Sequence, residues 1–157
     1  LDDFNRRVLE KAFTDARVEF HPLFDAAVHV FVSEHHPLAR RPQLSLEELA
    51  PYTRYSFEQG TSNSFYYAEE PFSYIPCERN IRVSDRGTLT NLLTTSNGYT
   101  LSTGVLSSEM QWGMASIPLA DAPTMHVGYI IHDERRPSPA LEQYLAELDR
   151  IIAESRP

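Results

Sequence analysis

The chain has one cysteine, little positive charge and no long hydrophobic run. Cys77 is the only cysteine, which excludes an intrachain disulfide framework and a zinc site built from cysteines, and favours a cytoplasmic protein. The 14 basic residues are outnumbered by 22 acidic ones, giving a formal charge of −8, so the chain lacks the basic surface that nucleic acid binding requires. No apolar stretch approaches the roughly 18 residues that span a bilayer, and no signal-peptide pattern is present. We therefore expect this chain to contact neither DNA nor a membrane.

The remaining composition is that of a folded globular protein. The chain has 157 residues, of which 41% are hydrophobic and 11% aromatic. This length suits one compact domain or two small lobes that share a backbone. The first residues, 1–4, lack a methionine and already follow helical periodicity. We expect the chain to be part of a longer gene product.

Hydrophobic spacing predicts five helices. In the first, over about 3–14, Phe4, Val8 and Ala12 recur at helical spacing. Ser45 and Glu48 form a capping box, which predicts a short helix to about Leu49. Two further helices are expected over 65–70 and 138–155. Another is expected around 89–93, with Ser84 or Asp85 as its N-cap. Asn97-Gly98 is expected to end this helix in a left-handed turn.

Strand signals alternate with these helices. Residues 18–24 and 27–33 predict two strands or one long bent strand, and further strands are expected at 52–57, 81–83, 99–101, 114–119 and 125–132. Alternation of this kind favours an α/β fold in which helices cover the faces of a sheet.

Three segments together resemble a known family. The first segment is a strand at 30–34 followed by His36-Pro37-Leu38-Ala39 and the capped helix 45–49. The second is the strand 81–83, the helix around 89–93 and Asn97-Gly98-Tyr99. The third is the strand 125–132 and the amphipathic helix that ends the chain. In this order and spacing they resemble the effector domain of LysR-type transcriptional regulators.

The resemblance implies a periplasmic-binding-protein-like fold of type II, with two α/β subdomains and an effector in the cleft between them. The backbone would cross between subdomains near 28–34 and 118–126. Residues 1–27 and 127–157 would form the remnant of an incomplete first subdomain, and 28–126 the second subdomain with both crossover strands. The resemblance also implies a homodimer or higher oligomer, and DNA binding only through a winged helix-turn-helix that this chain does not contain.

A polar loop is the first candidate for effector contacts. Residues 56–65 collect hydroxyl and amide groups between a predicted strand and a predicted helix, where ligands of open α/β sheets bind and exposed amides favour anions. The candidate residues are Ser56, Gln59, Gly60, Ser62, Ser64 and Phe65. The alternative is a solvated turn.

Two further clusters add candidates. Thr88 and Asn91 share a helix face, and in the family the corresponding helix start faces the cleft. Thr103 follows the strand 99–101. Solvated capping and turn roles are the alternatives. The resemblance implies a small effector and no catalysis. Hydroxyl and amide groups at a helix start favour an anionic effector, and they suit a carboxylate, a sulfur oxyanion or an amino acid about equally.

Other functions have weaker support. The histidines at 21, 29, 35, 36, 126 and 132 show no metal-ligand spacing, so we expect no metal and no cofactor. Cys77 lies beside Glu78, which opposes thiolate formation. The two alternatives are a stand-alone solute-binding protein of the same fold and a small serine hydrolase using Ser62 or Ser64; the latter lacks the second glycine of a nucleophile elbow.

Overall fold

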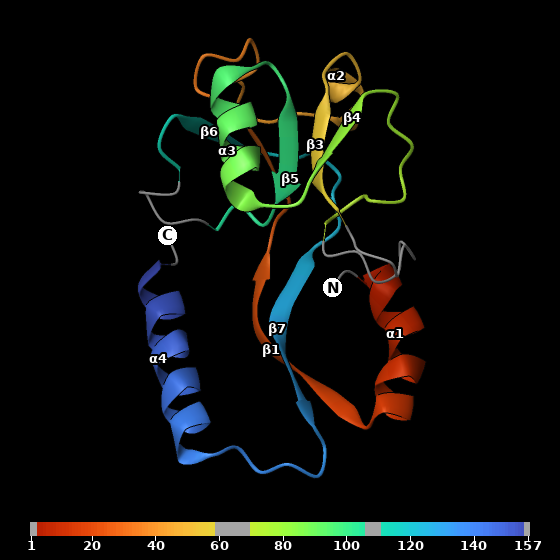
Figure 1. Ribbon diagram of the computed structural model, residues 1–157, viewed down its shortest axis with the longest axis vertical. Helices are drawn as coiled ribbons and strands as arrows, with labels where there is room; N and C mark the ends of the chain where they lie inside the picture. Colours follow the sequence, from red (N-terminus) through yellow and green to blue (C-terminus); the bar gives the residue numbers. More distant parts are fainter. Residues whose placement is uncertain (1–2, 59–69, 106–110, 156–157) are drawn as a thin grey trace.

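The computed structural model describes residues 3–58, 70–105 and 111–155. Within these ranges, four helices and seven strands alternate along the chain (Figure 1). Their bounds are α1 Asp3–Ala16, β1 Val18–Ala26, β2 His29–Ser33, α2 Leu46–Leu49, β3 Arg54–Phe57, β4 Asn80–Val83, α3 Arg86–Thr95, β5 Tyr99–Ser102, β6 Met114–Pro118, β7 Met125–His132 and α4 Pro139–Ser155. The α/β fold expected from the alternating pattern is confirmed.

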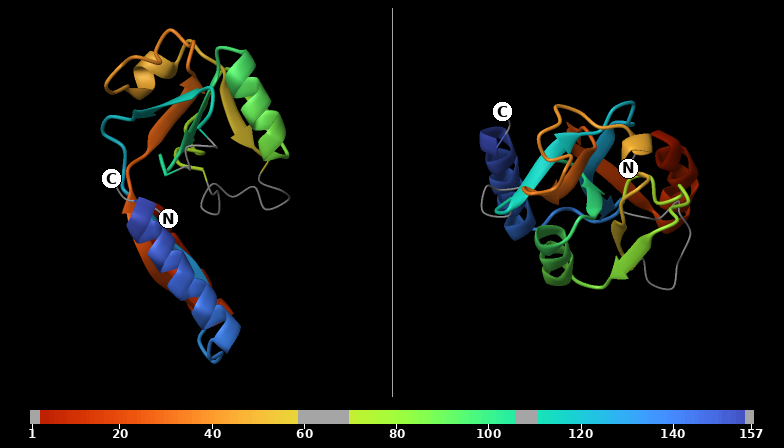
Figure 2. Two further views of the ribbon diagram at one scale, coloured as in Figure 1. Left: turned by 90° about the vertical axis from the view of Figure 1, so that its left-hand side faces the viewer. Right: turned by 90° about the horizontal axis from the view of Figure 1, so that it is seen from above.

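The strands form two separate sheets. In the smaller sheet, β1 and β7 pair antiparallel from Val18 opposite His132 to Ala26 opposite Met125. Figures 1 and 2 show α1 and α4 flanking this ribbon on opposite sides. Large apolar side chains remain exposed here, on β7 at Ile130 and on α4.

The larger sheet has five strands in the order β4-β3-β5-β2-β6. β3 pairs parallel with β4 and β5, whereas β2 pairs antiparallel with β5 and β6. One view in Figure 2 shows α3 over one face of this sheet and α2 beyond the other. Parallel strands are typical of α/β folds in which helices cover both faces of the sheet.

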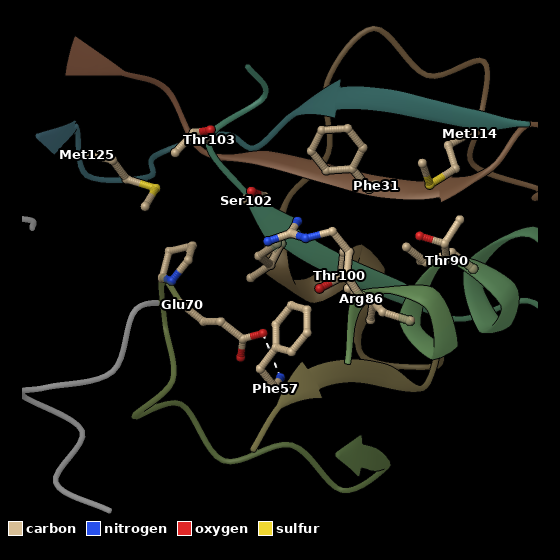
Figure 3. Close-up of a pocket in the computed structure, with 14 residues that line it drawn as sticks. Phe31, Phe57, Glu70, Arg86, Thr90, Thr100, Ser102, Thr103, Met114 and Met125 are labelled. Carbon is tan, nitrogen blue, oxygen red and sulfur yellow. Dashed lines mark hydrogen bonds between the residues drawn. The ribbon is translucent and has the colours of Figure 1, made fainter. Parts of the chain in front are cut away.

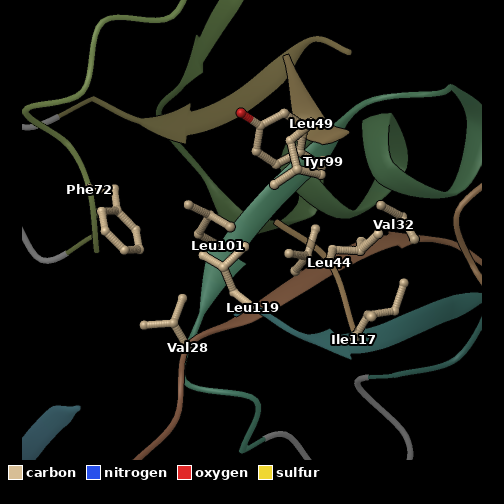
Figure 4. Packing of buried hydrophobic residues seen from close by; sticks show 10 residues of the cluster. Val28, Val32, Leu44, Leu49, Phe72, Tyr99, Leu101, Ile117 and Leu119 are labelled. Atoms are coloured by element: carbon tan, nitrogen blue, oxygen red, sulfur yellow. The ribbon is translucent and has the colours of Figure 1, made fainter. Parts of the chain in front are cut away.

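The core is centred on β2, whose alternate side chains enter two clusters. Val30 and Val32 are fully buried with Val28 on one face, and Phe31 is buried on the other face against Leu89 of α3. Figure 4 shows the first cluster. Its other members are Leu44, Leu49, Phe72, Tyr99, Leu101, Ile117 and Leu119. Because β2 is covered on both faces, the larger sheet is closely packed beneath the site described below.

Two neighbouring connections link the sheets. Residues 27–28 join β1 to β2, and 119–124 join β6 to β7. They lie together because the Leu119 amide donates to the Val28 carbonyl over 2.9 Å. The expected division into subdomains, 1–27 with 127–157 and then 28–126, stays a prediction.

Two local expectations are confirmed and two are wrong. The capping box of Ser45 and Glu48 forms, and residues 18–33 make two strands. In α1, however, Leu9 is the buried residue and Val8 is 40% exposed, because the helix lies on β1 by a different face. Gly98 does not adopt the left-handed conformation expected of a helix stop. Position 98 requires glycine for a steric reason instead, because an added Cβ would lie 2.2 Å from the Tyr55 ring. The helix expected at 65–70 falls almost entirely outside the described residues.

Candidate functional site

A pocket of about 170 Å³ opens beside the carboxyl ends of β3 and β5 (Figure 3). Ligands in open α/β sheets lie in this position, because strand ends and helix starts meet there. Its walls come from six elements and from the segment that follows residue 69. The lining residues are Phe31, Phe57, Glu70, Pro71, Arg86, Leu89, Thr90, Leu93, Thr100, Leu101, Ser102, Thr103, Met114 and Met125.

The pocket has an apolar base and a hydroxyl-bearing side. Phe31 and Leu89 belong to the buried core beneath it. Ser102 and Thr103, at the end of β5, supply hydroxyl groups from one wall. The hydroxyl of Thr100 is already engaged, donating to the Tyr55 carbonyl over 2.8 Å. Such a site combines apolar contact with a few polar groups, the usual composition of small-molecule pockets.

Arg86 brings a positive charge into the pocket. It is the first residue of α3, and its guanidinium carbon lies 5.6 Å from the centre of the Phe57 ring, within cation–π range. Among the described residues, the guanidinium makes no hydrogen bond or ion pair. The adjacent carboxylate of Asp85 is directed to the helix instead, accepting from the amide and the hydroxyl of Thr88 at 2.8 and 2.7 Å.

The hydrogen bonds from Thr88 hold the pKa of Asp85 below its usual range. Asp85 is therefore ionised at neutral pH and complements the positive end of the helix. Because its carboxylate serves as the helix cap, Arg86 next to it remains available to an anion. The pocket thus offers a guanidinium beside an aromatic ring, with hydroxyl groups near it.

The opposite wall is held in place by the buried Arg54. Its guanidinium donates to the carbonyls of Pro71 and Phe72, each over 2.9 Å, and the residue is only 6% exposed. One residue earlier, Glu70 Oε1 accepts from the Phe57 amide at the end of β3 over 2.8 Å. Together these bonds fix the wall segment 70–72 to β3, so its position relative to Arg86 is set before any ligand binds.

The family model of the LysR substrate binding domain matches residues 7–151 of this chain. The chain belongs to that family. The resemblance expected from the sequence is therefore confirmed, and with it the periplasmic-binding-protein-like fold of type II. A search of the curated proteins found no match to the chain.

Solved structures, a LysR family regulator among them, share the fold of this LysR domain at low sequence identity. HinK, a LysR family transcriptional regulator from Pseudomonas aeruginosa, is 16% identical, with a TM-score of 0.64 over 87% of this chain and 48% of that one. The effector binding domain of QuiR in complex with shikimate is 18% identical, with a TM-score of 0.57 over 86% and 65%. The Synechocystis CcmR regulatory domain in complex with 2-PG is 14% identical, with a TM-score of 0.60 over 87% and 68%. The chain spans about half the length of HinK.

The nine candidate residues of the LysR domain fall into three groups. Thr103 lines the pocket. Ser56 is buried and donates to Asn80 Oδ1 over 3.0 Å, while the exposed Thr88 and Asn91 lie on α3 without lining the pocket. Outside the described residues are Gln59, Gly60, Ser62, Ser64 and Phe65. The effector role of all nine stays a prediction.

Sequence reasoning missed Arg86 and Glu70 as site residues. One signal for Arg86 was present. The helix dipole disfavours a basic residue in the first turn of a helix, so an arginine at the start of α3 indicates a role other than helix stability. Glu70 had no such signal. It reaches the pocket because its carboxylate binds the amide of Phe57, thirteen residues earlier, a long-range contact that spacing does not show.

The remaining candidate chemistry has structural partners. Within the described ranges, no group of histidine, cysteine and acidic side chains could hold a metal. His126 Nδ1 lies 2.6 Å from Asp25 Oδ1 across the β1–β7 ribbon, and the thiol of Cys77 donates to the Arg79 carbonyl over 3.3 Å. In the described part of the chain, no helix combines the length and hydropathy that crossing a membrane requires.

Proposed function

We propose that this LysR domain binds a small anionic metabolite in the pocket beside α3, and that binding controls transcription by the full-length regulator. The observation that supports the proposal most is Arg86, a guanidinium that lines the pocket and has no acidic partner among the described residues. A guanidinium binds carboxylates and phosphates through paired hydrogen bonds. The hydroxyl groups of Ser102 and Thr103 suit the other oxygens of such a ligand.

The place of the pocket supports an interlobe effector site. Met125, which lines it, is the first residue of β7, directly after one of the two connections between the sheets. A ligand held there would contact both the larger sheet and the start of the ribbon. Its differential affinity for two arrangements of the sheets would then shift the equilibrium between them. Shikimate, bound by the QuiR domain, is itself a carboxylate.

Membership of the family supports a proposal about the full-length protein. We propose that the full-length protein is cytoplasmic, binds DNA through an amino-terminal winged helix-turn-helix and forms a homodimer or higher oligomer. The exposed apolar side chains of Ile130 on β7 and of Tyr144 and Ile151 on α4 supply apolar surface for self-association. Binding without catalysis is the proposed activity, because the family is regulatory and the sequence of the hydrolase alternative lacks the second glycine of a nucleophile elbow.

A thermal-shift measurement with small carboxylates, shikimate included, tests the proposal. A ligand at about 100 times its dissociation constant stabilises the fold by about 2.7 kcal/mol, which corresponds to roughly 5–10 °C for a chain of this size. Arg86→Gln should remove most of the shift. Arg40→Gln, which changes an exposed arginine in a loop, is the matched control and should keep it. Equal shifts in wild type and Arg86→Gln would place the ligand elsewhere.

A further inference from the structure

A chain of direct contacts joins the pocket to the connection between β1 and β2. It begins at Thr103, which lines the pocket directly after β5 ends at Ser102. It continues through Gly104 to the imidazole ring of His29, the first residue of β2. It ends at Ala27, whose carbonyl oxygen lies 3.2 Å from His29 Nδ1. Three residues therefore separate a wall of the pocket from the backbone that links the two sheets.

The contact between Gly104 and His29 leaves no spare room. A Cβ added to Gly104 would lie 2.2 Å from His29 Nδ1 and 2.6 Å from its Cγ, so the glycine backbone itself lies against the ring. Gly104 also has a φ of 72°, in the left-handed region that glycine adopts at little cost. Because the two groups touch, the ring of His29 must move when the turn at Gly104 moves.

His29 is tied to both connections between the sheets. A carbonyl oxygen only accepts, so His29 Nδ1 carries the hydrogen and donates it to the Ala27 carbonyl. This bond spans Val28, whose own carbonyl accepts from the amide of Leu119, in the other connection, over 2.9 Å. In the larger sheet, His29 also stands opposite Pro118 of β6, the residue before Leu119. A displacement of His29 therefore acts on the backbone of both connections.

The pocket end of this chain is able to respond to a ligand. Thr103 lies beyond the last residue of β5, so strand pairing does not fix it. Its Oγ1 accepts from the Val105 amide over 3.4 Å, which is long for a hydrogen bond. An acid oxygen of a ligand would accept a shorter, charge-assisted bond from the Thr103 hydroxyl. Drawing Thr103 toward the ligand displaces Gly104, the residue that touches His29.

From these contacts we infer that His29 is a positioning residue, which transmits effector binding at Thr103 to the connections between the two sheets. Ligand binding moves the turn at Gly104, the ring of His29 follows, and its bond to Ala27 carries the movement to the connection. This inference rests on the proposed function, because the ligand occupies the same pocket. It adds the route by which an occupied pocket changes the arrangement of the sheets, a coupling that links two sites through defined contacts.

A pair of variants with the same shape separates the hydrogen bond from the packing. Asparagine and leucine both branch at Cγ, but the amide nitrogen of asparagine stands where Nδ1 stands in histidine and donates, whereas leucine has no donor. His29→Asn should therefore keep the transmission, and His29→Leu should lose it. His29→Gln is a second test, because its amide lies one bond farther out and does not reach Ala27 in the same way. His35→Leu, which changes an exposed histidine, is the matched control.

Residual dipolar couplings of the backbone amides measure the angle between the two sheets. They are recorded on the isotopically labelled 157-residue chain without a ligand and at saturation with shikimate, hexanoate or benzoate, whichever gives the largest thermal shift. In wild type, His29→Asn and His35→Leu, the ligand should change this angle by the same amount. In His29→Leu and His29→Gln the change should fall about fivefold, the factor that corresponds to one hydrogen bond.

Affinity distinguishes transmission from a merely structural role of His29. When binding no longer has to move the sheets, isothermal titration of His29→Leu should give a dissociation constant that is unchanged or lower. A histidine with a structural role alone would lower the melting temperature and weaken binding while leaving the change of angle intact. A melting curve of each variant confirms folding, and if His29→Leu does not fold, the comparison of His29→Gln with His29→Asn decides the question.

The outcomes separate this inference from the proposed function. If a probe binds, Arg86→Gln weakens it, and the angle changes equally in His29→Asn and His29→Leu, the pocket stands and the transmission through His29 is wrong. A probe that binds to wild type without any change of angle leads to the same conclusion. If none of the three probes binds, or if Arg86→Gln leaves binding unchanged, the proposed pocket fails and the inference fails with it.

Discussion

Replacing Gly98 by alanine should destabilise the larger sheet, because the new methyl group has no space. The added Cβ would lie 2.2 Å from Tyr55 Cζ and 2.4 Å from its hydroxyl oxygen. Tyr55 is 4% exposed, so its ring must move roughly 1 Å within a packed cluster to restore ordinary contact. Overpacking of this kind costs about 1–3 kcal/mol.

The same movement threatens a hydrogen bond. The Tyr55 hydroxyl lies 2.5 Å from Ser96 Oγ, and losing such a bond costs about 1 kcal/mol more. The free energy of unfolding should therefore fall by about 2–4 kcal/mol, which lowers the melting temperature by roughly 5–15 °C. Chemical denaturation followed by circular dichroism measures this change.

Two further variants make the test specific. In a Tyr55→Ala background the ring is absent, so Gly98→Ala should cost only about 0.5 kcal/mol, and the difference is the coupling energy of a double-mutant cycle. Gly87→Ala, within α3, is the matched control. Its added Cβ would lie 3.2 Å from Asp85 Oδ1, a much milder contact than at Gly98, and alanine favours helix, so the net change should be within about 1 kcal/mol of zero. An equal cost of Gly98→Ala in both backgrounds would refute the steric argument.

Three other substitutions test the fold at separate places: a buried histidine, the cap of α2 and the arginine that holds one wall of the pocket. Burial of His36 lowers its pKa below the usual 6.5, against a smaller opposite effect of a backbone hydrogen bond, so the unfolded chain binds protons that the native state does not. Stability should therefore decline as the pH falls from about 6.5 toward the folded pKa, and His36→Gln should flatten this part of a stability–pH profile; an unchanged slope would contradict the assignment. Ser45→Ala removes the acceptor of the capping box and should cost about 1 kcal/mol in urea denaturation, whereas no loss would mean that α2 needs no cap. Arg54→Met leaves the carbonyls of Pro71 and Phe72 without their donor and should cost about 2–4 kcal/mol, with Arg54→Lys intermediate; a neutral result would show that the wall is held by other contacts.

Local signals in the sequence predicted most of the elements but not how they pack. The capping box at Ser45 and the strand and helix periods involve neighbouring residues, and the structure contains them. Whether Val8 or Leu9 of α1 faces the ribbon depends on the angle at which the helix lies on β1, which periodicity does not define. Gly98 shows the same limit, because the contact that requires glycine there comes from Tyr55, on a different strand.

The site was harder to predict for the same physical reason. Spacing placed candidates at strand ends, and Thr103 does line the pocket. Arg86 and Glu70 come together only after β3 and β5 pair and the buried Arg54 holds the segment after residue 69. Such contacts depend on strand order, and strand order is a property of the whole sheet rather than of any short segment.

The central claim is that a small ligand binds beside Arg86 with its acid group on the guanidinium. Amide chemical shifts of the isotopically labelled chain, titrated with whichever small carboxylate gives the largest thermal shift, test it most directly. We predict the largest changes at Arg86, Ser102, Thr103 and Glu70, and their loss in Arg86→Gln. Changes centred on the β1–β7 ribbon or on α4, or an unchanged spectrum with every carboxylate tested, would contradict the account.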